Sequence, residues 1–241
     1  LQNMTTDIFI RTYDRDLAFL VHAVKSIRDR VTGYRNIVIT APRAEAIRIG
    51  KAIGLPVIGV QPFADDYIGQ QHTKLKATDY SNAEVICFWD SDTVAAHPVD
   101  LSDLLFNGDR LIMHHVPFDG LQDGSQIWRD IMARDMGCVP EFEFMRRLPL
   151  AYHRSTLIGC VNHIEALHGM PLDIYMKRLP HRSFTEFNCA GMWAHNNERD
   201  LYDWRVDEAE VQQWKVLVKQ FWSWGGITRE IREDLKAMGI T

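Results

Sequence analysis

Two aspartates one residue apart, Asp90 and Asp92, follow an apolar run from Val85 to Trp89. Two carboxylates this close repel each other unless a cation or a proton lies between them. Mg²⁺ and Mn²⁺ prefer oxygen ligands and commonly bind through one or two carboxylates together with the phosphates of a substrate. The Asp-x-Asp pair therefore predicts a divalent-cation site. The plainer alternative is a solvated turn in which Asp90 caps the next segment.

The segments around this pair alternate between strand and helix patterns. Strands are predicted at 7–12, 36–40, 55–60, 84–89 and 109–115, and helices at 16–30, 43–54, 68–81 and 124–137. The alternation is typical of an α/β fold with a mostly parallel sheet flanked by helices. Ligands of such sheets bind beyond the carboxyl ends of the strands, which is where Asp90 and Asp92 are expected to lie.

The second half of the chain is less regular and richer in helix signals. A short strand that runs into a helix is predicted at 151–169. A helix is predicted at 183–196, with Ser183 as N-cap and Glu186 three residues further on, the spacing of a capping box. The tail from Asp207 is rich in tryptophan and is predicted to be helical.

Composition limits the class of protein. A net charge of −5 and a pI of about 6.1 argue against a generally basic nucleic-acid binder. No stretch approaches the roughly 18 apolar residues of a membrane span, and the first residues lack a signal-peptide pattern. The four cysteines contain no CxxC pair and suggest neither a zinc site nor a disulfide framework. We therefore expect a reducing, cytoplasmic setting.

Four segments of the chain occur in a recognisable order. They are DIFIRTYDRDL (7–17), GQQHTKLKA (69–77), VICFWDSDT (85–93) and FTEFNCAG (184–191). In this order they resemble GT-A glycosyltransferases, and more narrowly a poorly characterised bacterial and phage group of that fold. The resemblance covers most of residues 7–195. It implies one GT-A-like domain with a Rossmann-type sheet, in which 1–115 bind nucleotide sugar and metal and 116–241 form a helix-rich acceptor half.

The resemblance assigns the cation to the aspartate pair. In GT-A enzymes the Asp-x-Asp carboxylates hold Mn²⁺ or Mg²⁺, which bridges the diphosphate of a nucleotide sugar, so Asp90 and Asp92 are the expected ligands. A metal there neutralises charge that develops on the leaving diphosphate, which gives Asp92 a catalytic role. Such enzymes often recruit a later histidine as a further ligand. His195 is the candidate, and its rivals are His114 and His115.

The loop after the first strand is expected to hold the nucleoside of a UDP- or GDP-sugar. It contains Thr12, Tyr13 and Asp14, of which the tyrosine can stack on a base and the aspartate can accept from ribose or base. The alternative is a polar turn in which Asp14 or Asp16 caps the following helix.

Further donor contacts are expected from Gln71, Lys74, Asp90 and Ser91. Gln71 and Lys74 are three residues apart, so they share one face of the predicted helix 68–81. From that face they reach the diphosphate or the donor sugar, with Lys74 as a compact positive charge. The alternative is an ordinary solvated helix face.

Glu186 lies between aromatic residues in the segment FTEFNCAG. An acid in a partly apolar pocket has a raised pKa and can act as a base. In an inverting transferase it would deprotonate the acceptor hydroxyl, whereas in a retaining one it would position the acceptor or donor. The alternative is the capping-box role.

The sequence does not determine the acceptor. Residues 141–182 carry six Lys and Arg against four Asp and Glu, a net charge of +2, which suits a phosphate-bearing acceptor. A glycan precursor is the default, and a hydroxylated base in phage DNA is the nucleic-acid alternative. Four tryptophans of the C-terminal part fit a sugar platform, a partner contact or core packing: Trp204, Trp214, Trp222 and Trp224.

Two other functions compete with the transferase. DSDTV at 90–94 also matches the first motif of haloacid-dehalogenase-type phosphatases, in which Asp90 would be the nucleophile, Asp92 the acid/base and Mg²⁺ the cofactor. That motif usually lies near the N-terminus, and the second half of this chain lacks a clear paired-acid motif for the magnesium. The third possibility is a non-catalytic nucleotide-sugar binding module, against which the intact Asp-x-Asp argues.

Overall fold

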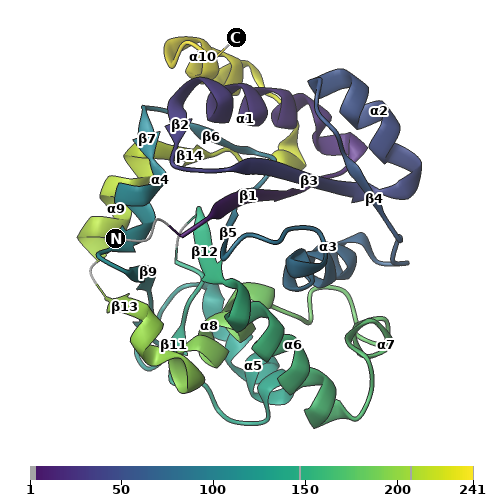
Figure 1. Ribbon diagram of the computed structural model, residues 1–241, viewed down its shortest axis with the longest axis vertical. Coiled ribbons are helices and arrows are strands. Elements are labelled where there is room, and N and C mark those ends of the chain that lie inside the picture. The colour runs from purple at the N-terminus through teal and green to yellow at the C-terminus, as the bar shows by residue number, and fades with distance from the viewer. Residues whose placement is uncertain (1–3, 147, 207, 241) are drawn as a thin grey trace.

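The computed structural model describes residues 4–146, 148–206 and 208–240. A five-stranded sheet in the order β12-β5-β1-β3-β4 runs through its centre (Figure 1). Neighbours among β1 (Thr6–Arg11), β3 (Asn36–Pro42), β4 (Ile58–Val60) and β5 (Val85–Phe88) are parallel. Only the edge strand β12 (Leu150–His153) is antiparallel to its neighbour β5. The expected α/β fold with a mostly parallel sheet is confirmed.

Helices flank both faces of this sheet. Figure 1 shows α1 (Leu17–Arg30) and α2 (Arg43–Ile53) on one face, and α3 (Asp66–Leu75) and α6 (Arg154–His168) on the other. α2 ends where predicted, because Gly54 adopts the left-handed conformation (φ 67°) that glycine tolerates at a helix end. α3 is shorter than predicted: Asp65 caps its start by accepting from two backbone N–H groups, and a 3₁₀ turn, η2 (Ala77–Asp79), replaces its last part.

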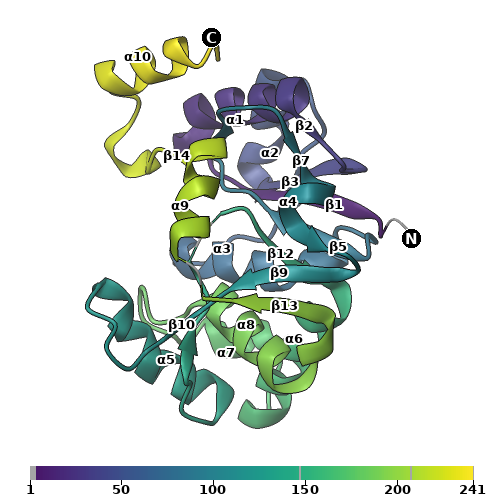
Figure 2. The ribbon, with the colours of Figure 1, turned by 90° about the vertical axis from the view of Figure 1, so that its left-hand side faces the viewer.

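The remaining chain forms a second sheet, further helices and several short strands. Figure 2 shows β9 (Arg110–His114) beside β13 (Tyr202–Arg205). These strands belong to a second, three-stranded sheet, in which β8 (Phe106–Asn107) lies on the other side of β9. The other helices here are α4 (Leu101–Leu105), α5 (Trp128–Met136), α7 (Leu172–Met176) and α8 (Glu186–Asn197). Four short strands form two further pairs, β2 (Val31–Thr32) with β7 (Val99–Asp100) and β10 (Val116–Pro117) with β11 (Phe142–Glu143). Single 3₁₀ turns are η1 (Asp14–Asp16), η3 (Gly124–Ile127) and η4 (Arg199–Leu201).

Two predictions about the second half are wrong in part. The helix predicted from Ser183 starts at Glu186 with Thr185 as N-cap, so Glu186 is the first helical residue and no capping box forms. The tail is only partly helical. Asp207 lies outside the described residues, α9 (Glu208–Leu217) is followed by a strand, β14 (Val218–Gln220), and α10 (Arg229–Ala237) comes after a 3₁₀ turn, η5 (Ser223–Gly225). β14 pairs antiparallel with β6 (Thr93–Ala95), which directly follows the Asp-x-Asp turn.

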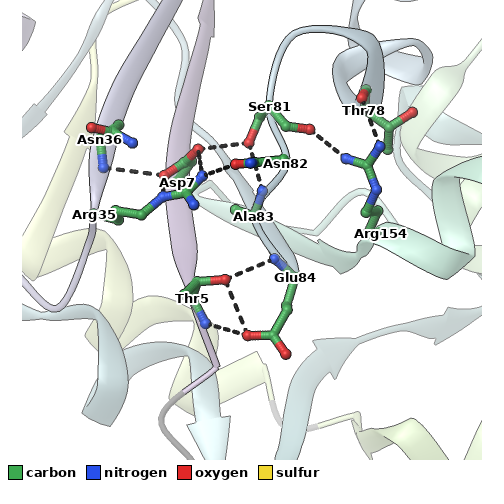
Figure 3. Close-up of polar contacts among 10 residues, drawn as sticks. All are labelled: Thr5, Asp7, Arg35, Asn36, Thr78, Ser81, Asn82, Ala83, Glu84 and Arg154. Carbon is green, nitrogen blue, oxygen red and sulfur yellow. Dashed lines mark hydrogen bonds and ion pairs between the residues drawn. The ribbon is translucent and has the colours of Figure 1, made fainter.

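A polar cluster holds the amino-terminal ends of the central strands together (Figure 3). Asp7 of β1 is only 1% exposed, and its carboxylate accepts two hydrogen bonds from Arg35, at 3.0 and 2.7 Å. It also accepts from the Ser81 hydroxyl at 2.6 Å and from the Asn36 backbone N–H at 3.1 Å. These contacts join β1 to the start of β3 and to the segment before β5, so the cluster fixes the three strands at the end opposite the aspartate pair.

Candidate functional site

The strand order reverses beside β1, with β3 and β4 on one side of it and β5 on the other. In open α/β sheets the crevice at such a reversal, beyond the carboxyl ends of the strands, is the usual place for a ligand. The Asp-x-Asp turn leaves β5 at this point. Because all four residues of β5 are buried, the strand gives the turn a rigid base.

A cavity of about 600 Å³ opens at this turn. Its walls come from α3, from the turn after β5, from the start of α8 and from the tail around β14. Lining side chains include Tyr67, Gln71, Lys74, Asp90, Glu186, Lys219, Gln220 and Trp222. Four of these lie among the residues expected from sequence to contact the donor or the acceptor, so tertiary folding brings them to one space.

Lys74 lies at the centre of the site and is only 6% exposed. Its Nζ donates to Asp90 Oδ1 at 2.9 Å, lies 3.3 Å from Glu186 Oε1, and is 4.8 Å from the centroid of the Phe187 ring. Burial by itself lowers the pKa of Lys74, but the two carboxylates outweigh it and hold the pKa above its usual value. The ammonium is therefore charged, and a solvated helix face is the wrong description of this residue.

Glu186 is the first residue of α8 and is 5% exposed. Burial raises the pKa of its carboxyl, while the charge of Lys74 opposes that rise. The unpaired N–H groups of a helix start stabilise a carboxylate, so the position suits an acid that must ionise during a reaction. Glu186 thus combines a raised pKa with a partner that can stabilise the anion.

Asp92 is 8% exposed and is held by the C-terminal tail. Its Oδ2 accepts from the Ser223 backbone N–H at 2.8 Å. The Gln220 side-chain nitrogen makes two long contacts, 3.3 Å to Asp92 Oδ1 and 3.4 Å to Asp90 Oδ2. Burial, and then the charge of Asp90, raise the pKa of Asp92. Sequence reasoning missed Gln220 and Ser223, because only the pairing of β14 with β6 brings them to the turn.

The chemistry of the aspartate pair, two adjacent carboxylates, is that of ligands for a hard divalent cation. The Gln220 amide nitrogen lies 3.4 Å from an oxygen of Asp90 and 3.3 Å from an oxygen of Asp92, so the two carboxylates have a common neighbour. Among the described residues no group of three His, Cys, Asp or Glu side chains is arranged to hold a metal. Mg²⁺ commonly keeps several waters and binds through one or two carboxylates plus substrate phosphates, so two protein ligands suffice.

The histidines expected as further ligands lie elsewhere. The His195 ring, near the end of α8, is 4.9 Å from Trp204 and 5.1 Å from Phe142 between ring centroids, and 6.0 Å from His115. His114 is buried, 6.0 Å from the Trp214 ring. His195 and His115 therefore lie together in an aromatic cluster, and the structure does not join His195 to Asp90 and Asp92 in a three-ligand group.

The loop after β1 is more closed than its expected nucleoside role requires. Thr12 is fully buried, and its backbone N–H donates to Thr40. The Tyr13 ring is 3% exposed between the guanidinium groups of Arg11 and Arg15, 4.3 and 4.5 Å from the ring centroid. Burial raises the pKa of Tyr13 to about 12 despite these cations. A base would stack on Tyr13 only after an arginine moves.

The acidic residues of this loop also have partners. Asp14 forms an ion pair with Arg48 of α2. Asp16 precedes α1 as its N-cap but makes no side-chain capping bond, and instead accepts from the Ser91 hydroxyl at 3.3 Å. Asp16 therefore occupies the N-cap position without a capping bond, whereas Asp14 does not cap a helix. Ser91, 5% exposed, holds the Asp-x-Asp turn against the start of α1.

Gln71 is the remaining donor-contact candidate. It is 3% exposed and lines the cavity, which excludes a solvated helix face here too. Its Oε1 has no hydrogen-bond partner among the residues that the structure describes. A buried acceptor without a partner costs free energy, so this atom is suited to receive a hydroxyl or N–H from a bound molecule.

No family model matches the chain, and no curated protein shows significant similarity to it. In the described part of the chain, none of the helices combines the length and apolar character needed to cross a bilayer.

Proposed function

We propose that this chain is a metal-dependent glycosyltransferase of the GT-A type, which moves a sugar from a nucleotide-sugar donor to an acceptor hydroxyl. The observation that carries the proposal is the buried Lys74, held between Asp90 and Glu186 where the strand order reverses, with Asp92 beside it. If all three carboxyls are ionised, one cation against three carboxylates leaves this centre two charges negative. A divalent cation would balance that charge.

Asp90 and Asp92, whose carboxylates both contact the Gln220 amide, would hold Mn²⁺ or Mg²⁺. When bound, the metal supplies Lewis-acid stabilisation of the charge on the leaving diphosphate. Gln220 would then withdraw its amide from the two carboxylates. The burial that raises the pKa of Asp92 disfavours its charged form, which a bound cation would restore.

Lys74 would act on the donor while keeping its contact with Asp90. Its charged ammonium lies on the cavity wall and can donate to a phosphate oxygen, and its hold on Asp90 fixes that carboxylate in place. The Gln71 Oε1, which is buried without a partner, would accept from a hydroxyl of the donor sugar. Both side chains come from α3, so donor recognition would centre on that helix.

Glu186 would act on the acceptor. Its raised pKa suits a general base that takes the proton of the acceptor hydroxyl, with the helix start and Lys74 close to its oxygens. That role requires an inverting transferase. In a retaining enzyme the same carboxylate would orient the acceptor by hydrogen bonding.

The proposal is tested by a thermal-shift screen of UDP-, GDP-, CMP- and dTDP-sugars, each with Mn²⁺, Mg²⁺ or EDTA. A ligand that binds only the folded state at a hundredfold excess over its Kd adds about 2.7 kcal/mol. For a chain of this length that raises Tm by roughly 5–10 °C. We expect such a shift for one nucleotide, lost with EDTA and in Asp92→Asn, and kept in the control Asp119→Asn, whose side chain is 85% exposed.

Two results would contradict the transferase. The absence of any donor-dependent shift, together with metal-dependent hydrolysis of p-nitrophenyl phosphate, would favour the phosphatase that the DSDTV motif also matches. A metal-dependent shift without turnover of the bound donor, by transfer or by slow hydrolysis, would favour a binding module.

A further inference from the structure

Two tryptophans of the tail remain exposed to solvent. Trp222 is 61% exposed and Trp224 is 88% exposed, whereas Trp214 is buried and Trp204 packs in the aromatic cluster with His195. The exposed rings lie 6.4 Å apart between centroids at an angle of 84°. An indole offers a large flat apolar surface, and two such surfaces side by side are unusual on a protein that leaves them uncovered.

Trp222 belongs to the candidate site, and Trp224 contacts it. Trp222 lines the cavity that also contains Lys74 and Glu186. The backbone on both sides of it is bound to the Asp-x-Asp turn, because Phe221 N–H donates to the Asp92 carbonyl at 2.9 Å and Ser223 N–H donates to the Asp92 carboxylate at 2.8 Å. Trp222 itself has a φ of 57°, a left-handed conformation that disfavours bulky side chains. The backbone thus holds the indole in a conformation that its own preference opposes.

The charges around the cavity leave few cations for a phosphate-bearing acceptor. Of the four described cations that line it, three already contact carboxylates. Lys74 binds Asp90 and Glu186, Arg146 binds three acids, and Lys219 binds Asp234 at 2.6 Å. Among the described cations that line the cavity, only Lys215 forms no ion pair, and Lys74 is assigned to the donor, so few remain for the phosphates through which nucleic acid is chiefly bound. Aromatic faces without such cations suit the C–H face of a sugar ring.

We propose that Trp222 and Trp224 form the acceptor subsite, in which one indole face stacks on the pyranose ring of a neutral saccharide and the other ring, turned by 84°, contacts the edge of that sugar. The subsite rests on the proposed transferase function and specifies its acceptor class. The tryptophans would place the sugar at the mouth of the cavity with one hydroxyl directed towards Glu186. The two backbone hydrogen bonds to Asp92 would fix the position of the acceptor relative to the donor.

The test is saturation-transfer difference NMR on the full chain without donor or metal. The probes are the methyl glycosides of glucose, galactose, mannose and N-acetylglucosamine, with a short oligothymidylate as the nucleic-acid probe. We expect saturation of the ring C–H protons of at least one glycoside. Its apparent affinity should fall about two- to tenfold in Trp222→Ala and in Trp224→Ala, the range of one aromatic contact. Ile47→Ala, an equally exposed apolar site on α2 at 74%, is the matched control and should bind normally.

Saturation of no glycoside would overturn the proposal, as would equal binding by wild type and the double tryptophan variant. Binding of oligothymidylate alone would overturn it in favour of a nucleic-acid acceptor. Because neither donor nor metal is present, these results are independent of the thermal-shift screen. Loss of the donor shift with intact glycoside binding would refute the transferase mechanism and keep the saccharide site, and the reverse would refute only the acceptor subsite.

Discussion

Replacing Lys74 by methionine tests the centre of the site through stability, without any substrate. The change keeps the length and most of the volume of the side chain and removes one buried charge. Asp90 and Glu186 then face each other without the cation that separates them, because both lie within 3.3 Å of the Lys74 Nζ. Like-charged carboxylates in a buried site destabilise the folded state.

The size of the effect follows from burial. Removing one partner of a buried ion pair costs about 3–5 kcal/mol. The Glu186 side chain is 7% exposed, but that of Asp90 is 26% exposed and recovers part of its hydration. The lower end, about 3 kcal/mol, is therefore expected, which corresponds to a fall in Tm of roughly 6–12 °C. Lys76→Met is the matched control. Lys76 is partly exposed and pairs at 3.3 Å with the exposed Asp79, so this change should cost only about 0–1 kcal/mol.

The stability lost in Lys74→Met should also depend on pH, and the pKa of Glu186 decides in which direction. Burial raises the pKa of Glu186 and Lys74 opposes that rise, so the variant should raise it further. A carboxyl whose pKa is higher in the folded state stabilises the fold fully below its unfolded pKa of about 4.3. That stabilisation is lost as pH rises through the folded value. The gap between wild type and Lys74→Met should therefore widen from pH 5 to pH 8.

Urea unfolding followed by circular dichroism at these two pH values measures both effects. Lys74→Met combined with Glu186→Gln should recover most of the lost stability, because the buried charge without a partner is gone. The reasoning would be refuted if Lys74→Met cost no more than Lys76→Met, or if its cost were the same at pH 5 and pH 8.

Three further perturbations test other parts of the structure. In EDTA, Asp92→Asn should leave Tm unchanged or raise it. Burial and a neighbouring carboxylate raise the pKa of Asp92 and so disfavour its charged form. Differential scanning fluorimetry measures the change in Tm. Arg35→Ala should cost about 1.5–3 kcal/mol at pH 7 in urea unfolding, since it leaves the buried Asp7 with fewer donors. Burial alone would raise the pKa of Asp7, but its hydrogen bonds, first that of Arg35, hold it below its usual value, so this cost should shrink as pH falls through the folded pKa. Gly191→Ala should destabilise the fold by about 1–2 kcal/mol, because the added Cβ would lie 2.5 Å from the buried Phe144 side chain. This overpacking outweighs the better helix propensity of alanine. A gain in Tm would contradict the packing.

Local patterns identified the first half of the fold well. The apolar runs at 7–12, 36–40 and 84–89 became β1, β3 and β5, because strands buried on both faces need apolar residues at nearly every position. The place of Asp90 and Asp92, beyond a buried parallel strand, followed from the same pattern. Gly54 and the helical spacing before it marked the end of α2. Each of these features depends on neighbours a few residues apart, and such neighbours are visible in the sequence.

Contacts between distant segments decided the rest. Lys74 and Glu186 were each candidates, but only the packing of α3 against α8 makes them an ion pair. The antiparallel entry of β14 beside β6 brings Gln220 and Ser223 to the aspartates, and nothing in the tail's own pattern indicates that pairing.

Burial likewise distinguished aromatic residues that were both candidates for ligand contact in the sequence. Tyr13 is enclosed by two arginines, whereas Trp222 stays exposed at the mouth of the cavity. Residue types and spacing determined which side chains could do chemistry here. Which of them meet was decided by the tertiary structure, because burial and electrostatic pairing depend on distances across the fold that spacing along the chain does not define.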